Sequence, residues 1–243
     1  MKSVVIIPTY NEKDNMRPLV RAILAVHSSI DVLIVDDGSP DGTGEAADSL
    51  SQEQPRVRVL HRTGARGRGL AGLDGFRRAS AEKYELIMEM DGDFSHDPAD
   101  ITRILEAMSG ADLVIGSRFI NGGRDLRSGS GRRFISRIAN AVSRMILGIP
   151  VKDCTSGYRC FKRPLLEKLL ERPLISKGPS VVEELLYRAV KNGAKVVELP
   201  IHFHDRKKGR SKLDLRKMIE VFLVILCVRL GFQASARSDG TSL

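Results

Sequence analysis

Short apolar runs alternate with segments of helical periodicity along most of this 243-residue chain. Such runs suit strands buried on both faces, and apolar residues at helical spacing suit helices packed against a sheet. The expected strands are 4–7, 32–35, 57–60, 85–90, 113–115 and 196–203. The expected helices are 13–27, 43–51, one after 69, one after 98, one from about 132, 181–191 and 215–232. This alternation predicts an α/β fold with a mostly parallel sheet and helices on both faces, followed by an apolar C-terminal helix.

Two carboxylates follow the strand expected at 85–90, in the sequence Asp91-Gly92-Asp93. Open α/β sheets bind their ligands at the carboxyl ends of strands. A pair of carboxylates is a hard-oxygen site that suits Mg²⁺ or Mn²⁺ shared with substrate phosphates, and Gly92 would let the backbone approach a ligand closely. An ordinary acidic turn is the alternative. A second acidic turn upstream favours the site.

That second turn is Asp36-Asp37-Gly38-Ser39, at the end of the strand expected at 32–35. Its polar residues could simply cap the following helix. However, capping needs only one such residue, and here an acid pair directly follows a buried strand. We therefore expect an Asp side chain to accept hydrogen bonds from a base or ribose, with Tyr10 and Glu12 in the same pocket.

The segment from Gly67 to Gly72 matches the pattern GxGxxG, which would suggest a dinucleotide enzyme. In that fingerprint the glycines follow their strand directly and usually open the first βα unit of the fold. Here six residues separate Leu60 from Gly67. A glycine-rich turn beside a phosphate is the favoured interpretation.

The formal charge of +9 is concentrated in two segments, 118–144 with a net charge of +6 and 205–217 with +5. Local basicity of this kind points to a polyanionic ligand or an anionic membrane surface. Three cysteines without a CxxC pair suggest reduced thiols in the cytosol, and the N-terminal residues do not resemble a signal peptide. The longest apolar run, 221–228, is too short to span a bilayer. It is expected to dock on a membrane or a small membrane protein, or else to complete the core.

Other titratable residues are expected to be structural. His96, His202 and His204 lack the spacing of a metal site, and carboxylates with phosphate oxygens need no imidazole. Glu183 and Glu184 could supply a general base, but one of two adjacent acids on an apolar helix more often faces solvent.

Five motifs together resemble the family 2 glycosyltransferases, specifically the polyprenol-phosphate (dolichol-phosphate) mannose synthases. They occur in order over roughly residues 3 to 217. They are Pro8-Thr-Tyr-Asn-Glu12, Val35-Asp-Asp-Gly-Ser-Pro-Asp-Gly-Thr43, Met90-Asp-Gly-Asp-Phe-Ser-His96, Gly116-Ser-Arg118 and Phe203-x-x-Arg206-x-x-Gly-x-Ser-Lys212.

The resemblance implies a GT-A fold, a GDP-mannose donor, a divalent metal and a polyprenyl phosphate acceptor. It implies nucleotide contacts from Pro8, Tyr10, Glu12, Val35 and Asp37, contacts to the diphosphate and metal from Asp91, Gly92 and Asp93, and phosphate contacts from Arg118, Arg206 and Lys212. Asp93, Arg118 and Arg206 are the expected catalytic residues. Ser95 stands where some members place a Gln metal ligand, and Gly92 where many have Ala. Arg132 and Arg133 in the other basic segment could assist with the acceptor phosphate.

The chemistry agrees with a phosphate acceptor, because a phosphate monoester with a second pKa of about 6 needs no general base. The expected organisation is a catalytic domain at 1–213, a docking helix at 214–232 and a disordered tail at 233–243. The enzyme would act at the cytosolic face of a membrane. Transfer of glucose or another sugar to the same lipid class is the alternative within enzymes. A nucleic-acid-binding module is disfavoured by the absence of Trp, the 5% aromatic content and the acidic cleft.

Overall fold

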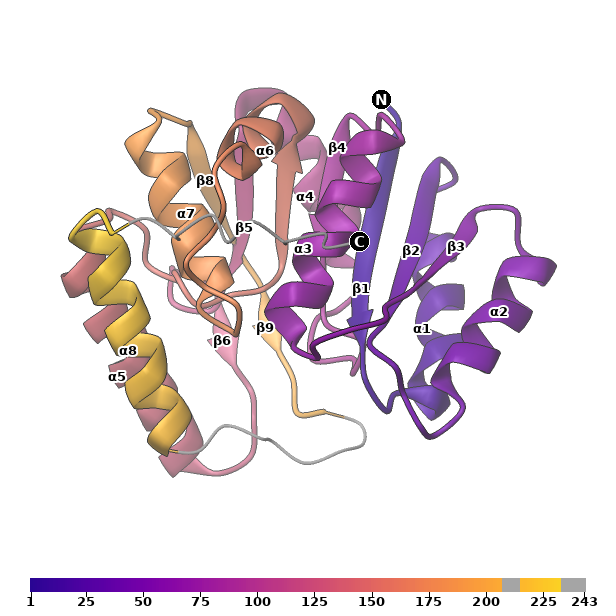
Figure 1. Ribbon diagram of the computed structural model, residues 1–243, viewed down its shortest axis with the longest axis horizontal. Helices are drawn as coiled ribbons and strands as arrows, with labels where there is room; N and C mark the ends of the chain where they lie inside the picture. Colours follow the sequence, from indigo (N-terminus) through magenta and orange to yellow (C-terminus); the bar gives the residue numbers. More distant parts are fainter. Residues whose placement is uncertain (207–214, 233–243) are drawn as a thin grey trace, which may run out of the picture.

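A seven-stranded sheet forms the centre of the protein, in a computed structural model that describes residues 1–206 and 215–232 (Figure 1). The strand order is β3-β2-β1-β4-β7-β5-β8. The strands are β1 (Ser3–Thr9), β2 (Ile30–Asp36), β3 (Val57–His61), β4 (Leu86–Glu89), β5 (Leu113–Ser117), β7 (Arg159–Lys162) and β8 (Val196–Pro200). Strand β7 is antiparallel to β4 and β5, and the other neighbours are parallel. The mostly parallel sheet is thus confirmed.

Helices cover both faces of this sheet. They are α1 (Lys13–Val26), α2 (Thr43–Glu53), α3 (Arg68–Ala81), α4 (Asp100–Ala107), α5 (Ser130–Leu147), α6 (Arg163–Leu170), α7 (Val181–Lys191) and α8 (Leu215–Arg229), with a 3-10 turn at Met108–Gly110. Successive β1 residues point to opposite faces. Val5 and Ile7 join a core cluster with α1, α2 and α4, whereas Val4 and Ile6 join one with α3, α6 and α7. Burial on both faces explains why these strands are apolar throughout.

The C-terminal half differs from the expected pattern in two places. The strand expected at 196–203 is two strands. Its first part, β8, pairs with β5 as far as Pro200, and its second part, β9 (His202–Phe203), pairs with β6 (Arg124–Asp125) in a separate sheet. Strand β7 and helix α6 were not predicted. Strand β7 inserts between β4 and β5, so these two parallel strands do not touch directly.

Helix α8 packs beside α5, as Figure 1 shows at the left of the molecule. The inward side chains of Ile225 and Val228 are buried in the core cluster of α3, α6 and α7. Its outward side chains Ile219, Leu223 and Leu226 are 44–58% exposed. The helix therefore contributes to the core and still presents apolar surface. It ends at Arg229, short of the expected residue 232. None of the helices in the described ranges is long and apolar enough to cross a bilayer.

Glycines permit a close contact between the start of α3 and the loop that precedes α7. A Cβ atom at Gly69 would lie 2.1 Å from the carbonyl oxygen of Gly178 and 2.8 Å from Cγ2 of Val181. The conflict is with backbone, so it cannot be relieved by a rotamer change. The absence of a side chain at this position therefore sets the distance between α3 and α7.

Gly69→Ala should lower the free energy of unfolding by about 1 to 3 kcal/mol or more, as expected for overpacking. Gly131→Ala is the matched control, because a Cβ atom there meets nothing within 4 Å and the residue lies in α5. This control should be neutral or stabilising by up to about 1 kcal/mol. Urea denaturation measures both, and equal midpoints for the two variants would contradict the packing argument.

Candidate active site at the carboxyl edge of the sheet

The polar turns singled out in the sequence meet at one edge of the sheet. Strands β1, β2 and β4 are parallel neighbours, so their carboxyl ends lie together at the lower edge in Figure 1. Tyr10 and Glu12 follow β1, Asp37 follows β2, and Asp91 and Asp93 follow β4. The topology thus brings the predicted nucleotide-binding and metal-binding turns together.

Each of the two carboxylates after β4 faces an arginine. Arg68 donates to Oδ1 of Asp91 from Nη2 at 2.7 Å and from Nε at 3.1 Å. Arg206 places Nε 2.9 Å from Oδ2 of Asp93. Burial alone would raise the pKa of Asp91, but the guanidinium of Arg68 outweighs it and holds that pKa well below its usual range. Asp91 therefore stays ionised across the physiological range, with Arg68 as its present partner.

His96 supports this turn from behind. Its Nδ1 accepts a hydrogen bond from the backbone N–H of Asp91 at 3.1 Å, so the neutral ring carries its proton on Nε2. The ring is buried and stacks on Tyr158, with centroids 4.7 Å apart. Burial lowers the pKa of His96 and so favours this neutral form. The structural role expected for this histidine is confirmed.

A divalent metal fits this edge only if substrate oxygens complete its coordination. Within residues 1–206 and 215–232, no group of three or more His, Cys, Asp or Glu side chains is placed to hold a metal ion. Asp91 and Asp93 offer two hard-oxygen ligands, and Mg²⁺ or Mn²⁺ bound through one or two carboxylates typically takes its other ligands from phosphates and water. Ser95 is buried behind Asp93, and its backbone N–H donates to Oδ1 of Asp93 at 3.0 Å. Ligation by its hydroxyl stays a prediction.

Gly92 packs against β1 and α1 instead of bordering open space. A Cβ atom there would lie 3.3 Å from Ile7 Cγ2 and Met16 Cε, and 3.4 Å from Thr9 Cγ2. The small residue thus lets the turn settle against the core. Contact between its backbone and a ligand remains a prediction.

The turns after β1 and β2 are bonded to each other. Asn11 N–H donates to Ser39 Oγ at 3.1 Å, and Glu12 N–H donates to Thr43 Oγ1 at 3.0 Å. Burial, together with the nearby Asp93, raises the pKa of Glu12, although Asn15 donates to its carboxylate. Glu12 also lines a surface hollow together with Asn11, Lys13, Asp14, Asn15 and Asp41. The loop is therefore pre-formed, with a carboxyl group beside the acid pair.

Both carboxylate oxygens of Asp37 already have partners within the protein, whereas the sequence predicted an acceptor free to bind a ribose or base. Its Oδ2 accepts the backbone N–H of Gly67 at 2.7 Å, and its Oδ1 pairs with Arg62. The carboxylate thus anchors the glycine-rich turn before α3 to the end of β2. A nucleotide would have to use the remaining acceptor capacity of this carboxylate.

Pro8 and Val35 lie side by side in β1 and β2, one residue short of the carboxyl ends. Val35 is fully buried, and its carbonyl accepts the hydroxyl of Thr9 at 3.3 Å. These two positions therefore lie just beneath the turns at the carboxyl edge of the sheet. Their contribution to nucleotide binding stays a prediction.

Arg118 is bound to an acid instead of lying free for a phosphate. Its Nε and Nη2 each lie 2.8 Å from a carboxylate oxygen of Asp153, which is fully buried, and Nη2 also donates to Thr155 at 2.6 Å. Burial would raise the pKa of Asp153, but the guanidinium of Arg118 lowers it. Breaking a buried pair of this kind is strongly unfavourable. The structure thus favours an architectural role for Arg118 over the predicted catalytic one.

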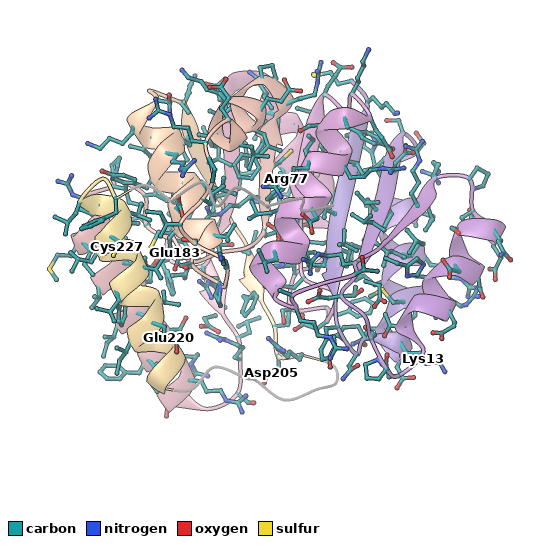
Figure 2. The ribbon with its side chains drawn as sticks, in the orientation of Figure 1. Lys13, Arg77, Glu183, Asp205, Glu220 and Cys227 are labelled. Atoms are coloured by element: carbon teal, nitrogen blue, oxygen red, sulfur yellow. The ribbon has the colours of Figure 1, made fainter. Side chains whose placement is uncertain are left out.

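The two basic segments meet through the small sheet of β6 and β9. The backbone N–H of Ser128 donates to Oδ2 of Asp205 at 2.6 Å, and Asp205, labelled in Figure 2, lies two residues after β9. Arg132 and Arg133 begin α5 just beyond, and Arg133 donates to the carbonyl of Arg127 at 2.5 Å. Arg206 follows directly and reaches Asp93. The predicted phosphate ligand Lys212 lies outside the described residues.

Glu183 and Glu184 are both buried, so the expectation that one of them faces solvent was wrong (Figure 2 labels Glu183 on α7). Glu184 accepts the backbone N–H groups of Ile175 and Ser176 and pairs with Arg188 at 2.6 Å. Oε2 of Glu183 has no hydrogen-bond partner among the residues that the structure describes. Burial raises the pKa of Glu183 to about 7, partly offset by Arg159. Neither carboxylate lies on an exposed helix face.

Arg68 is the site residue that sequence reasoning missed. It lies between Gly67 and Gly69 in the turn favoured as a phosphate-side loop, and that placement was the available signal. Nothing in the sequence indicates that a side chain at position 68 reaches Asp91, because the contact depends on how α3 packs against β4. The glycine-rich turn does lie at the site.

Comparisons with known proteins agree with this geometry. A family model described as "Glycosyl transferase family 2" matches residues 4–170. The chain is 44% identical to the polyprenol monophosphomannose synthase of Mycolicibacterium smegmatis over 88% of this chain and 81% of the relative. It is 39% identical to the undecaprenyl-phosphate mannosyltransferase of Micrococcus luteus, with 88% of each chain covered. It is 35% identical to the dolichol-phosphate mannosyltransferase of Pyrococcus furiosus, covering 90% of this chain and 61% of that protein.

A solved structure shares the fold. Glucosyl-3-phosphoglycerate synthase from Mycobacterium tuberculosis, crystallised with Mn²⁺, UDP and glucosyl-3-phosphoglycerate, superimposes with a TM-score of 0.70 at 20% identity. The match covers 96% of this chain and 81% of that one. This likeness agrees with the GT-A fold implied by the sequence motifs. With the family model covering most of the sheet and the acid pair following β4, this chain belongs to glycosyltransferase family 2.

Proposed function

We propose that this enzyme transfers mannose from GDP-mannose to a polyprenyl (dolichyl) phosphate at the cytosolic face of a membrane, with Mg²⁺ or Mn²⁺. The proposal rests on the acid pair Asp91 and Asp93 after β4. Arg206, which follows β9, forms an ion pair with Asp93. Acids suit a metal–diphosphate donor, and the adjacent cation suits an acceptor phosphate. The names of the three relatives above support mannose as the sugar over the glucose alternative.

The acceptor phosphate can attack without a general base. A phosphate monoester has a second pKa of about 6 and is mostly a dianion near neutral pH. Its oxygen forms a bond to the anomeric carbon while the bond from that carbon to the donor diphosphate breaks, and the electron pair leaves with GDP. Attack from the face opposite the leaving group inverts the anomeric centre and gives a β-linked product.

The chain's own residues would hold the charges of this reaction in place. Asp91 and Asp93 would hold the metal, which when bound neutralises negative charge on the departing diphosphate. Arg206 lies 2.9 Å from Asp93 and would turn to the acceptor phosphate beside it. Glu12, on the β1 side of the same edge, would hold the nucleotide with Tyr10.

Helices α5 and α8 together offer a surface for the membrane. Phe134, Ile135, Ile138 and Met145 on α5 are 44–76% exposed, and Ile219, Leu223 and Leu226 are exposed on α8 beside it. Arg132 and Arg137 are exposed on α5 as well. Contiguous apolar surface bordered by cations is typical of proteins that lie on anionic bilayers. A lipid phosphate held there would lie on the side of the molecule where β6 and β9 approach the acid pair.

The product identifies the acceptor and donor. Incubating the protein with labelled GDP-mannose, Mn²⁺ and a polyprenyl phosphate should move label into the organic phase, and UDP-glucose should serve far less well. Asp93→Asn should lower turnover at least about 100-fold, a loss of roughly 2.7 kcal/mol in transition-state stabilisation. Equal labelling with prenyl alcohol as acceptor would refute a phosphate nucleophile.

Glu183→Gln should leave mannosyl transfer nearly unchanged, because a phosphate acceptor needs no base. It should alter the pH dependence of stability. With a folded pKa of about 7 against 4.5 for the ordinary group, wild-type Glu183 binds a proton in the folded state that the unfolded chain has lost. Wild-type stability therefore falls as pH rises from about 4.5 through 7, and the variant lacks this loss.

Thermal or urea denaturation at pH 5 and pH 8 measures the effect. Glu183→Gln should gain about 1 to 3 kcal/mol over wild type between the two pH values. Glu184→Gln is the control, because both of its oxygens accept N–H groups, and it should be destabilised at both pH values. A large loss of transfer by Glu183→Gln with the fold intact would argue for an acceptor that needs a base.

Membrane association should depend on the α5–α8 face. Flotation with vesicles containing anionic lipid should show weaker binding for Leu223→Gln, which removes apolar contact, and for Arg137→Gln, which removes one cation. Each cation near such a surface contributes about 1 kcal/mol, or roughly fivefold in affinity. Arg77→Gln removes the same charge from α3, where Figure 2 labels it away from α5 and α8, and should bind like wild type. Equal weakening by Arg77→Gln would show a non-specific charge effect.

A further inference from the structure

Arg68 occupies the side of the acid pair that lies against α3. Besides its two hydrogen bonds to Asp91, its Nη1 lies 3.2 Å from Oε1 of Glu89, a buried oxygen that has no hydrogen-bond partner in the described structure. The guanidinium is therefore the nearest positive charge to two carboxylates at the end of β4. Its side chain remains 34% exposed. The side chain of Arg68 is thus bound to Asp91 and Glu89 and is still partly exposed to solvent.

Two glycines shape the space around this ion pair. A Cβ atom at Gly157 would lie 2.4 Å from Nη2 of Arg68, so in its present position the guanidinium lies against bare backbone there. A Cβ atom at Gly72 would lie 2.7 Å from Oε1 of Glu89, so the carboxylate also packs closely against a glycine. Both members of the pair are thus fitted into the fold. Arg68 is therefore held by Asp91 and Glu89 with little room around its guanidinium.

Arg68 and Arg206 each neutralise one member of the Asp91–Asp93 pair. Arg206 is 46% exposed, whereas Arg68 is more enclosed and contacts a second acid. A divalent cation bound to Oδ1 of Asp91 would approach the guanidinium that already holds this oxygen. Like charges at such a distance repel each other, and more strongly in a partly buried site than in water. Metal binding therefore requires Arg68 to move or to gain an anion.

We propose that Arg68 is a positioning residue that holds the metal side of Asp91 in the unliganded protein and passes to the donor diphosphate when metal and nucleotide bind together. The inference rests on the proposed metal–diphosphate site. Metal alone binds weakly, because it must displace a guanidinium that then has no new partner. A nucleoside diphosphate supplies that partner, since guanidinium groups bind phosphate oxygens in a bidentate manner. Metal and nucleotide consequently strengthen each other's binding.

Mn²⁺ binding without and with GDP tests the proposal, with free Mn²⁺ measured by electron paramagnetic resonance. Wild type should bind Mn²⁺ weakly alone and at least about tenfold more tightly with saturating GDP, which corresponds to about 1.4 kcal/mol of coupling. Arg68→Gln should bind Mn²⁺ alone about tenfold more tightly than wild type, and its gain in affinity with GDP should be about tenfold smaller than that of wild type, the remaining gain coming from diphosphate oxygens that complete the coordination of the metal.

Two further variants serve as controls. Arg77 lies on the same helix and pairs with Asp74. Arg77→Gln should therefore bind Mn²⁺ as wild type does, without and with GDP. Arg68→Lys keeps the charge beside Glu89 and Asp91, and it should keep weak binding of metal alone. If Arg68→Gln unfolds, this lysine variant still decides, because tight Mn²⁺ binding by it would overturn the proposal.

The outcomes separate this inference from the proposed function. Strong GDP-dependent Mn²⁺ binding in wild type that persists unchanged in Arg68→Gln would overturn the role of Arg68 and leave the metal site intact. Failure of wild type and variants to bind Mn²⁺ even with GDP would overturn both the inference and the proposed metal site.

Discussion

The pairing of acids with arginines at one edge of the sheet is the interaction on which the rest of this structure depends. A parallel sheet gathers the turns after its strands, and here those turns are acidic. Asp37 pairs with Arg62, Asp91 with Arg68, Asp93 with Arg206, and Asp153 with Arg118. Several carboxylates this close would repel one another and resist burial without such partners. The arginines therefore make the polar edge compatible with a folded domain.

These pairs also divide into two kinds. Those of Asp37 and Asp153 are closed, because their arginines are at most 9% exposed and join parts of the backbone. Those of Asp91 and Asp93 are open, since Arg68 and Arg206 retain 34% and 46% exposure. Closed pairs suit architecture, and open pairs suit exchange with a ligand. In this enzyme, the exposure of the arginine separates the structural pairs from the pairs at the candidate site. The acid does not, because it is Asp in all four pairs.

Much of the fold could be predicted from the sequence, because strands buried on both faces leave continuous apolar runs. The acid pair at Asp91 and Asp93 was predictable for the same reason, as it follows such a run directly. Strand β7 was not, since it has four residues, one of which is Arg159, and it lies in a segment without clear periodicity. Arg68 was missed, and the pairing of Arg118 with Asp153 was not foreseen, because the partner of a long side chain depends on the three-dimensional packing. Glu183 and Glu184 were misjudged because both faces of α7 near its start are covered.

The antiparallel insertion of β7 has a consequence for the order in which the chain can assemble. Strands β1 to β4 pair with one another within the first 89 residues, and in the described part of the chain β4 alone among them has a later partner, β7. Strands β5 and β8 join the sheet only through β7, which lies 42 residues beyond the end of β5. During synthesis, β1 to β4 can therefore pair before β7, the partner of both β4 and β5, has been made. Domains of this size commonly fold through such partly assembled states, and in this protein β7 is the strand that joins β1 to β4 with β5 and β8 in one sheet.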